Sequence, residues 1–200
     1  MFNRVSEKVA ESMVKRGTVV SKDKELYLFG IQQGLTLILH IATTVVVGLL
    51  FGTLWQLLLF TAAYIALRSF AGGYHARTPQ RCYVLSTLIT IAESFIIKYV
   101  VLNVFIYIGL LFLSGIIIIV FSPIDNANKP LDDLEKKVYK KKAVIICIIE
   151  ILMAVLFLCL NLLPIAACLT WTLVMVSVMM VMDIRLQKSL LKLIFNGLIK

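Results

Sequence analysis

The chain has 200 residues, of which 60% are hydrophobic and only 16% are charged. Soluble domains carry about 25% charged residues, so this chain has too little polar surface to enclose its apolar side chains in water. The composition therefore excludes a soluble globular protein and indicates an integral membrane protein. The formal net charge is +9, but the basic residues flank apolar segments and form no aromatic-lined groove, which argues against nucleic acid as a partner.

The first segment, residues 1–25, lacks the apolar stretch of roughly 7–15 residues that a secretory signal needs. Phe2, Val5, Val9 and Met13 recur at helical spacing, and charged residues lie opposite them. This pattern predicts an amphipathic N-terminal helix. Such a helix lies on the membrane surface or packs on the rest of the protein, and the sequence leaves both arrangements open.

Three apolar segments follow, at residues 26–67, 83–121 and 143–182. Each is about twice as long as the roughly 20 residues that one spanning helix needs. Turn-forming residues lie near each midpoint: Gly48 and Gly52, then Asn103, then Asn161 and Pro164. We therefore predict an all-α polytopic membrane protein, with six transmembrane helices arranged as three hairpins in one membrane domain over residues 1–200.

The distribution of charge predicts the orientation of these hairpins. Segments 1–25, 68–82, 122–142 and 183–200 lie on one side and hold every Lys and Arg except Lys98, which lies close enough to a hairpin tip to reach the outer interface. The positive-inside rule places these segments, and with them both termini, in the cytoplasm. In the basic segment 122–142, acidic residues precede the main basic run, which suits the dipole of a cytoplasmic helix leading into the fifth span.

The segment RSFAGGYHARTPQRCYV, residues 68–84, interrupts the apolar sequence with polar residues. Thr78 followed by Pro79 predicts a helix start, because Thr is a good N-cap and Pro fits the first helical position. Cys82 then falls in the first turn of the third span. The positive helix end and the neighbouring arginines favour the thiolate, which is the reactive form of cysteine. Free N–H groups at this helix start would also face a developing oxyanion.

His75 is the candidate partner of Cys82. Seven residues of unbroken helix would separate the two by about 10.5 Å, but the helix break at Thr78 allows the chain to fold back. Gly72 and Gly73 give the preceding backbone the freedom that this requires. A thiolate beside an imidazole is the minimum apparatus for acyl transfer, in which the sulfur attacks a carbonyl and the imidazolium protonates the leaving amine. The alternative is that both are packing residues at the membrane interface. No Asp, Glu or Asn nearby in the sequence can be identified as the group that orients His75.

The residues GGYHARTPQRC, preceded by LRS, resemble the motif of the accessory gene regulator B family of bacterial membrane endopeptidases. The likeness extends over most of the chain, through its length, its amphipathic N-terminus, the basic motif after two spans and the segment SPIDNANKP at 122–130. It implies a multi-pass cysteine endopeptidase of the bacterial cell membrane. Such proteins remove the C-terminal part of a quorum-sensing precursor peptide through an enzyme thioester and promote its cyclisation to a thiolactone or lactone.

On this sequence the resemblance implies that Cys82 is the nucleophile and His75 the catalytic histidine. Arg68 matches a basic position with a supporting role, and Gly73 belongs to the Gly-x-His-Ala element. The implied partners are the lipid bilayer and an amphipathic precursor peptide with an acidic C-terminal tail. The arginines that would meet such a tail are Arg68, Arg77 and Arg81.

No cofactor or metal is expected, because the cysteines and histidines lack the spacing of zinc ligands. Apart from Cys82, the cysteines lie in apolar runs and are expected to be core thiols: Cys147, Cys159 and Cys168. A homodimer is one arrangement that polar helix faces allow, but nothing in the sequence counts subunits.

Polar residues inside the predicted spans support other hypotheses. Glu93 and Glu150 lie near the middles of the third and fifth spans, where a charge costs about 2.5–3.5 kcal/mol and should face protein or water. Gln32, Thr36 and His40 form one stripe on the first span. A small transporter or channel subunit would use Glu93, Glu150 and His40. Alternatively, these polar residues only form hydrogen bonds that hold the helices together, and no transport is involved. A non-catalytic scaffold for a signalling partner is the remaining hypothesis.

Overall fold

The computed structural model describes residues 2–73, 78–124 and 131–198. In these ranges the chain forms helices and no strand: α1 (Phe2–Lys15), the 3-10 helix η1 (Ser21–Asp23), α2 (Lys24–Phe51), α3 (Leu54–Ala71), α4 (Pro79–Tyr99), α5 (Val104–Phe121), α6 (Asp133–Cys159) and α7 (Leu163–Leu198). Among the described helices, the six from α2 to α7 are long and apolar enough to cross a membrane. The predicted all-α fold with six spans and an N-terminal helix is confirmed.

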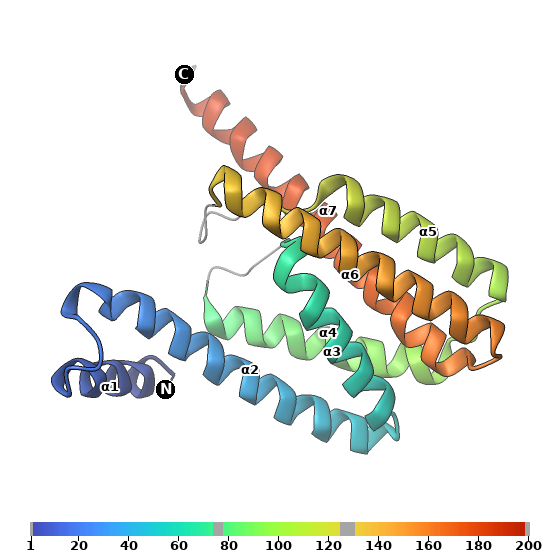
Figure 1. Cartoon of the computed structure of the whole chain (residues 1–200), viewed down its shortest axis with the longest axis horizontal. Coiled ribbons are helices and arrows are strands. Elements are labelled where there is room, and N and C mark those ends of the chain that lie inside the picture. The colour runs from blue at the N-terminus through green and yellow to red at the C-terminus, as the bar shows by residue number, and fades with distance from the viewer. Residues whose placement is uncertain (1, 74–77, 125–130, 199–200) are drawn as a thin grey trace.

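The six spans form three hairpins whose turns fall at polar residues and glycine. Gly52 ends α2 in the left-handed conformation (φ 71°) and donates its N–H back to carbonyls of the last turn. Asn103 caps α5 by accepting the N–H of Phe105 at 3.1 Å, and Asn161 turns between α6 and α7 with a φ of 57°. Figure 1 shows the hairpin tips at one end of the bundle, with the end of α3 and the start of α4 at the other end.

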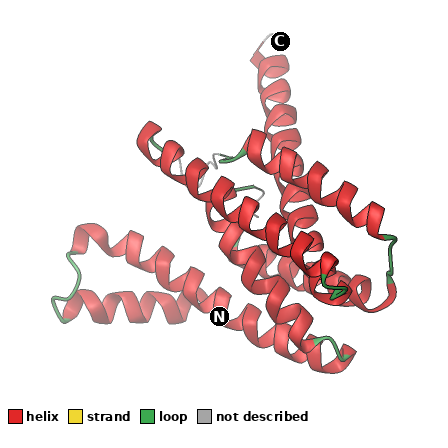
Figure 2. Ribbon diagram, turned by 45° about the vertical axis from the view of Figure 1, so that its right-hand side comes forward, coloured by secondary structure: helices red, strands yellow, loops and turns green. Residues whose placement is uncertain are grey.

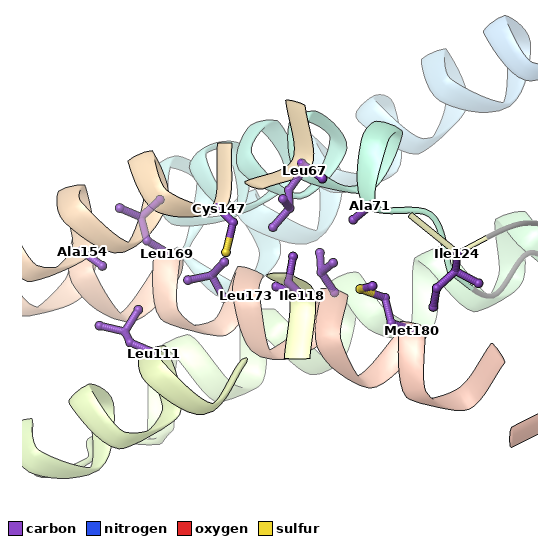
Figure 3. Packing of buried hydrophobic residues seen from close by; sticks show 12 residues of the cluster. Leu67, Ala71, Leu111, Ile118, Ile124, Cys147, Ala154, Leu169, Leu173 and Met180 are labelled. Atoms are coloured by element: carbon purple, nitrogen blue, oxygen red, sulfur yellow. The ribbon is translucent and has the colours of Figure 1, made fainter. Parts of the chain in front are cut away.

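Helix α7 is the central helix of the bundle. It packs against α3, α5 and α6, and most of its spanning segment is buried. The apolar core joins these four helices, and Figure 3 shows it through Leu67, Ala71, Leu111, Ile118, Cys147, Ala154, Leu169, Leu173 and Met180. In each of the other spans fewer than a third of the residues are buried, as expected for helices that contact lipid.

Helix α4 belongs to a second packing group. It packs chiefly against α2, and more lightly against α3 and α7. A hydrogen bond of 2.7 Å joins the hydroxyls of Tyr83 and Thr43 near the start of α4, and another of 2.7 Å joins Ser94 to Thr53 near its end. Helix α4, which carries Cys82 in its first turn, is therefore attached to the α2–α3 hairpin by polar contacts at both ends.

Lys98 lies at the tip of the α2–α3 hairpin. Its ammonium group donates to the carbonyl of Phe51, the last residue of α2, at 2.8 Å. This hydrogen bond satisfies a helix-end carbonyl that has no partner within its own helix. The one basic residue that departs from the predicted charge pattern therefore connects α4 to the end of α2.

Helix α1 folds back along the first turns of α2 (Figures 1 and 2). Ser6 and Ala10 of α1 are buried, and the ammonium of Lys24 lies 3.4 Å from the Glu11 carboxylate. The face of α1 that contacts α2 therefore carries Ser6 and Ala10, whereas Val9 of the predicted apolar face is 42% exposed, so the choice between the two arrangements stays a prediction.

Two detailed expectations were wrong. Gly48 forms no turn: it is buried inside α2, where a Cβ atom would come 2.7 Å from the Cα of Leu54, so the glycine lets α2 and α3 approach closely. Cys159, the last residue of α6, is exposed, whereas the preceding Phe157 and Leu158 pack against the core. Cys147 and Cys168 are buried thiols, as expected.

Replacing Gly48 with Ala should destabilise the protein by about 1–3 kcal/mol, because the added methyl group overlaps the α3 backbone. The matched control is Gly34→Ala in the same helix, where nothing lies within 4 Å of the Cβ position. The control should be neutral or slightly stabilising, since Ala favours helix more than Gly. Thermal unfolding in detergent, followed by circular dichroism, measures both variants. Equal melting temperatures would contradict the close crossing.

Candidate active site

The predicted helix start at Thr78 is confirmed. Thr78 has extended backbone (φ −132°, ψ 145°), Pro79 is the first residue of α4, and the Thr78 hydroxyl accepts the N–H of Arg81 at 3.3 Å. The N–H of Cys82 donates to the Thr78 carbonyl at 3.0 Å. Cys82 is a free cysteine and is half-buried, so it lies at the helix start without being enclosed.

The N–H groups at the start of α4 are mostly engaged. Pro79 has no N–H, and Arg81 and Cys82 both donate to Thr78. Within the described residues, the N–H of Gln80 is the one at this helix start that has no acceptor. The sequence suggested several free donors for an oxyanion, whereas among the described residues Gln80 alone offers one at this helix start, so further donors would have to come from side chains or another segment.

Gly72 ends α3 in close contact with the segment that follows α5. Its φ is 75° and its ψ is −157°, a combination that is essentially restricted to glycine. The N–H of Ile124 donates to the Ala71 carbonyl at 3.0 Å, and a Cβ atom on Gly72 would overlap the Ile124 carbonyl oxygen. Figure 3 shows Ala71, Ile124 and Met180 gathered at one end of the core cluster.

Gly73 lies between Arg68 and the backbone of α7. A Cβ atom on Gly73 would overlap the Arg68 guanidinium and come 3.3 Å from the backbone nitrogen of Met180. Arg68 folds back over the end of its own helix and donates from Nη1 to the Gly72 carbonyl. The two glycines therefore serve close packing of three backbone segments, in addition to the conformational freedom that the sequence suggested.

Two polar residues near Arg68 were missed by the sequence reasoning. Asp183 on α7 is only 7% exposed and interacts electrostatically with Arg68. Tyr64, one turn before Arg68 on α3, is hydrogen-bonded to the Arg68 side chain and interacts electrostatically with Cys82 and Glu93 on α4. The spacing of four residues between Tyr64 and Arg68 was a signal in the sequence. No local signal marked Asp183, which comes from the far end of the chain.

The predicted site residues are only partly brought together by the described structure. Arg68 and Gly73 are in contact, and Tyr64 connects Arg68 electrostatically to Cys82. His75 and Arg77 lie outside the described residues. The separation of the imidazole and the thiol therefore stays a prediction.

Arg81 lies at the exposed start of α4, beside an open groove of about 340 Å³. The groove runs along one face of α4 and is otherwise lined by Gln80, Val84, Leu85 and Leu88. The surface of this groove is mostly apolar, and its one cationic residue, Arg81, directly precedes Cys82 in the sequence. Within the described ranges, no three His, Cys, Asp or Glu side chains group as metal ligands.

The midspan residues of the transporter hypothesis lie in different packing groups. Glu93 and Glu150 are buried, and within the described residues both Glu93 oxygens and Oε2 of Glu150 lack a hydrogen-bond partner. His40 is half-buried on α2, which contacts the α4 helix of Glu93. Helix α6, with Glu150, packs on α3, α5 and α7 instead.

Fold and site together define a polytopic helical membrane protein with a free thiol at the start of a span. The family model described as accessory gene regulator B matches residues 6–180, and the chain belongs to this family. Members of the family act in accessory gene regulator quorum-sensing systems.

Individual relatives agree with this assignment. An AgrB-like protein of Clostridium perfringens is 27% identical over 169 residues, which cover 78% of this chain and 79% of that protein. An AgrB-like protein of Listeria monocytogenes is 28% identical over 145 residues, covering 70% and 71% of the two chains. Protein FsrB of Enterococcus faecalis is 32% identical over 107 residues, covering 52% of this chain and 44% of FsrB. No solved structure matches the chain.

Replacing Gly72 with Ala should destabilise the protein by more than Gly52→Ala does, by roughly 1–3 kcal/mol. Both glycines have a positive φ, of 75° and 71°, but the Cβ position of Gly52 has nothing within 4 Å. Gly52 also has a left-handed ψ of 26°, which other residues tolerate at a modest cost. Thermal unfolding in detergent compares the two variants. A smaller or equal loss for Gly72→Ala would mean that the contact with Ile124 does not constrain this turn.

Proposed function

We propose that this chain is a membrane cysteine endopeptidase that cuts a quorum-sensing precursor peptide near its C-terminus and cyclises the part that it retains. The observation that carries the proposal is the free, half-buried Cys82 at the positive end of α4, in a chain of a quorum-sensing family. Cys82 is the nucleophile and His75 the proton carrier. The supporting and substrate-binding residues are Arg68, Gly73, Arg77 and Arg81.

In the first step the Cys82 thiolate attacks the carbonyl carbon of the scissile peptide bond. The tetrahedral intermediate collapses as the C–N bond breaks, and the leaving amine takes a proton from the His75 imidazolium. The N-terminal part of the precursor remains as a thioester on Cys82, and the C-terminal tail departs. The N–H of Gln80, which has no acceptor among the described residues, is one donor at the helix start for the developing oxyanion.

In the second step a thiol or hydroxyl of the bound precursor attacks the thioester. A new thioester or ester bond closes the ring, and the sulfur of Cys82 is released. The thioester retains much of the reactivity of the acyl group. A side chain held next to it competes with water through its high effective concentration.

The surroundings of Cys82 suit an amphipathic precursor with an acidic tail. The apolar groove along α4 matches the apolar face of such a peptide, and Arg81 at its end offers a cation to a carboxylate. Residues 1–200 act as one membrane domain in the bacterial cell membrane, with segments 1–25, 68–82 and 122–142 and both termini in the cytoplasm. A homodimer is compatible with this function but is not required by it.

The orientation can be tested with the two cysteines at opposite ends of the bundle. In variants that keep only Cys159 or only Cys82, a membrane-impermeant maleimide added to intact cells should label Cys159 and spare Cys82, because Cys159 ends α6 at a hairpin tip. Inverted vesicles should give the opposite result. Labelling of Cys82 from outside the cell would contradict the proposed cytoplasmic location of the site.

Cys82→Ala and His75→Ala should each lower precursor cleavage at least about 100-fold, because one removes the nucleophile and the other the proton carrier. The control is the combined replacement of Cys147, Cys159 and Cys168 with Ala, which should retain cleavage. Co-expression with a precursor encoded nearby, followed by mass spectrometry, detects a peptide lighter by its tail.

The same assay separates the competing functions. The transporter hypothesis rests on buried carboxylates with oxygens that lack a hydrogen-bond partner among the described residues, and it requires that Cys82→Ala be tolerated while Glu93→Gln and Glu150→Gln abolish function. The scaffold hypothesis requires that Cys82→Ala and Glu150→Gln both be silent. Loss of cleavage in the triple-cysteine control would show that another thiol is the nucleophile.

A further inference from the structure

We infer that Asp183 on α7 is a positioning residue that holds Arg68 against the turn formed by Gly72 and Gly73. Asp183 is 7% exposed, and burying a carboxylate is unfavourable unless a cation or hydrogen bonds compensate for its lost hydration. Arg68 on α3 interacts electrostatically with this carboxylate across the bundle. The catalytic consequence of the inference rests on the proposed function, but the positioning itself does not.

The packing of Gly73 brings α7 and Arg68 together. Gly73 lies against the Arg68 guanidinium on one side and the backbone nitrogen of Met180 on the other. Asp183 follows Met180 by three residues, so both lie on the same face of α7. The helix face that supports the turn is therefore the face that carries the carboxylate.

Arg68 is suited to connect the carboxylate with the turn. Its guanidinium donates from Nη1 to the Gly72 carbonyl, and a planar group with five N–H donors can serve a carboxylate at the same time. Asp183 thereby limits the positions that Arg68 can take, and Arg68 limits where the backbone leaves α3. His75 follows Gly73 by two residues in the sequence, so this turn is the point from which the chain enters the segment of the proposed catalytic histidine. On the proposed function, a displaced turn should therefore lower the rate of the chemical step.

The kinetic test compares Asp183→Asn with Asp183→Glu in the full-length chain in nanodiscs. Asp183→Asn should lower kcat for precursor cleavage at least about 10-fold and change KM less than about twofold, because it misplaces a catalytic group without removing a substrate contact. Asp183→Glu should recover part of kcat. The matched control is Glu150→Gln, which neutralises another buried carboxylate at 6% exposure and should leave kcat unchanged. A lower KM with unchanged kcat in Asp183→Asn would overturn the inference, since Asp183 would then only compete with the substrate for Arg68.

A second measurement does not depend on catalysis. Trypsin cuts after Arg77, and the rate of this cut in the detergent-solubilised chain reports how firmly the segment after Gly73 is held. Asp183→Asn and Arg68→Ala should each accelerate the cut severalfold, and the double variant should be no faster than Arg68→Ala, because both act through one contact. Glu150→Gln should cut at the wild-type rate. A wild-type rate in Asp183→Asn would overturn the positioning role, whereas a wild-type chain that cuts no precursor would overturn only the proposed function.

Discussion

Close backbone contact at the end of α3 is the constraint on which the candidate site depends. Gly72 lies against the carbonyl of Ile124, and Gly73 lies against the backbone of α7 at Met180 and the guanidinium of Arg68. No side chain other than hydrogen fits at either glycine without displacing a neighbour. The chain therefore enters the motif from a point that is held by three separate segments of the bundle, at one end of its apolar core.

The two halves of the candidate site come from different packing groups. The turn that precedes His75 is attached to the group of α3, α5, α6 and α7, whereas Cys82 begins α4, which packs chiefly on α2. The groups meet mainly where α2 packs on α3, whereas α4 itself contacts α3 and α7 only lightly. Near the hairpin tips, Thr53 is hydrogen-bonded to Ser94 of α4. The position of Cys82 relative to the turn at Gly72 therefore depends on how α4 is attached to the α2–α3 hairpin.

Much of the architecture was accessible from the sequence, because bilayer thickness fixes the length of a span and polar residues mark its ends. Thr78, Pro79, Asn103 and Asn161 were each placed correctly for this reason. The pairing of helix faces was not accessible: a span that is apolar on all sides shows no difference between its lipid face and its core face. Asp183 was missed on that account, Gly48 was taken for a turn residue, and Cys159 for a core thiol. The candidate nucleophile was found because its local context, a cap and a proline, is encoded in adjacent residues.

The hydrogen bond from Lys98 to the Phe51 carbonyl has a consequence for how the protein responds to its membrane. An ammonium group stays at the headgroup level, so this bond sets the depth of the α2 terminus and of α4 by the same anchor. In a thinner or thicker bilayer these helices would have to tilt together and could not slide past each other. Lipid composition would then act on the helix that begins with Cys82 through a contact at the opposite surface.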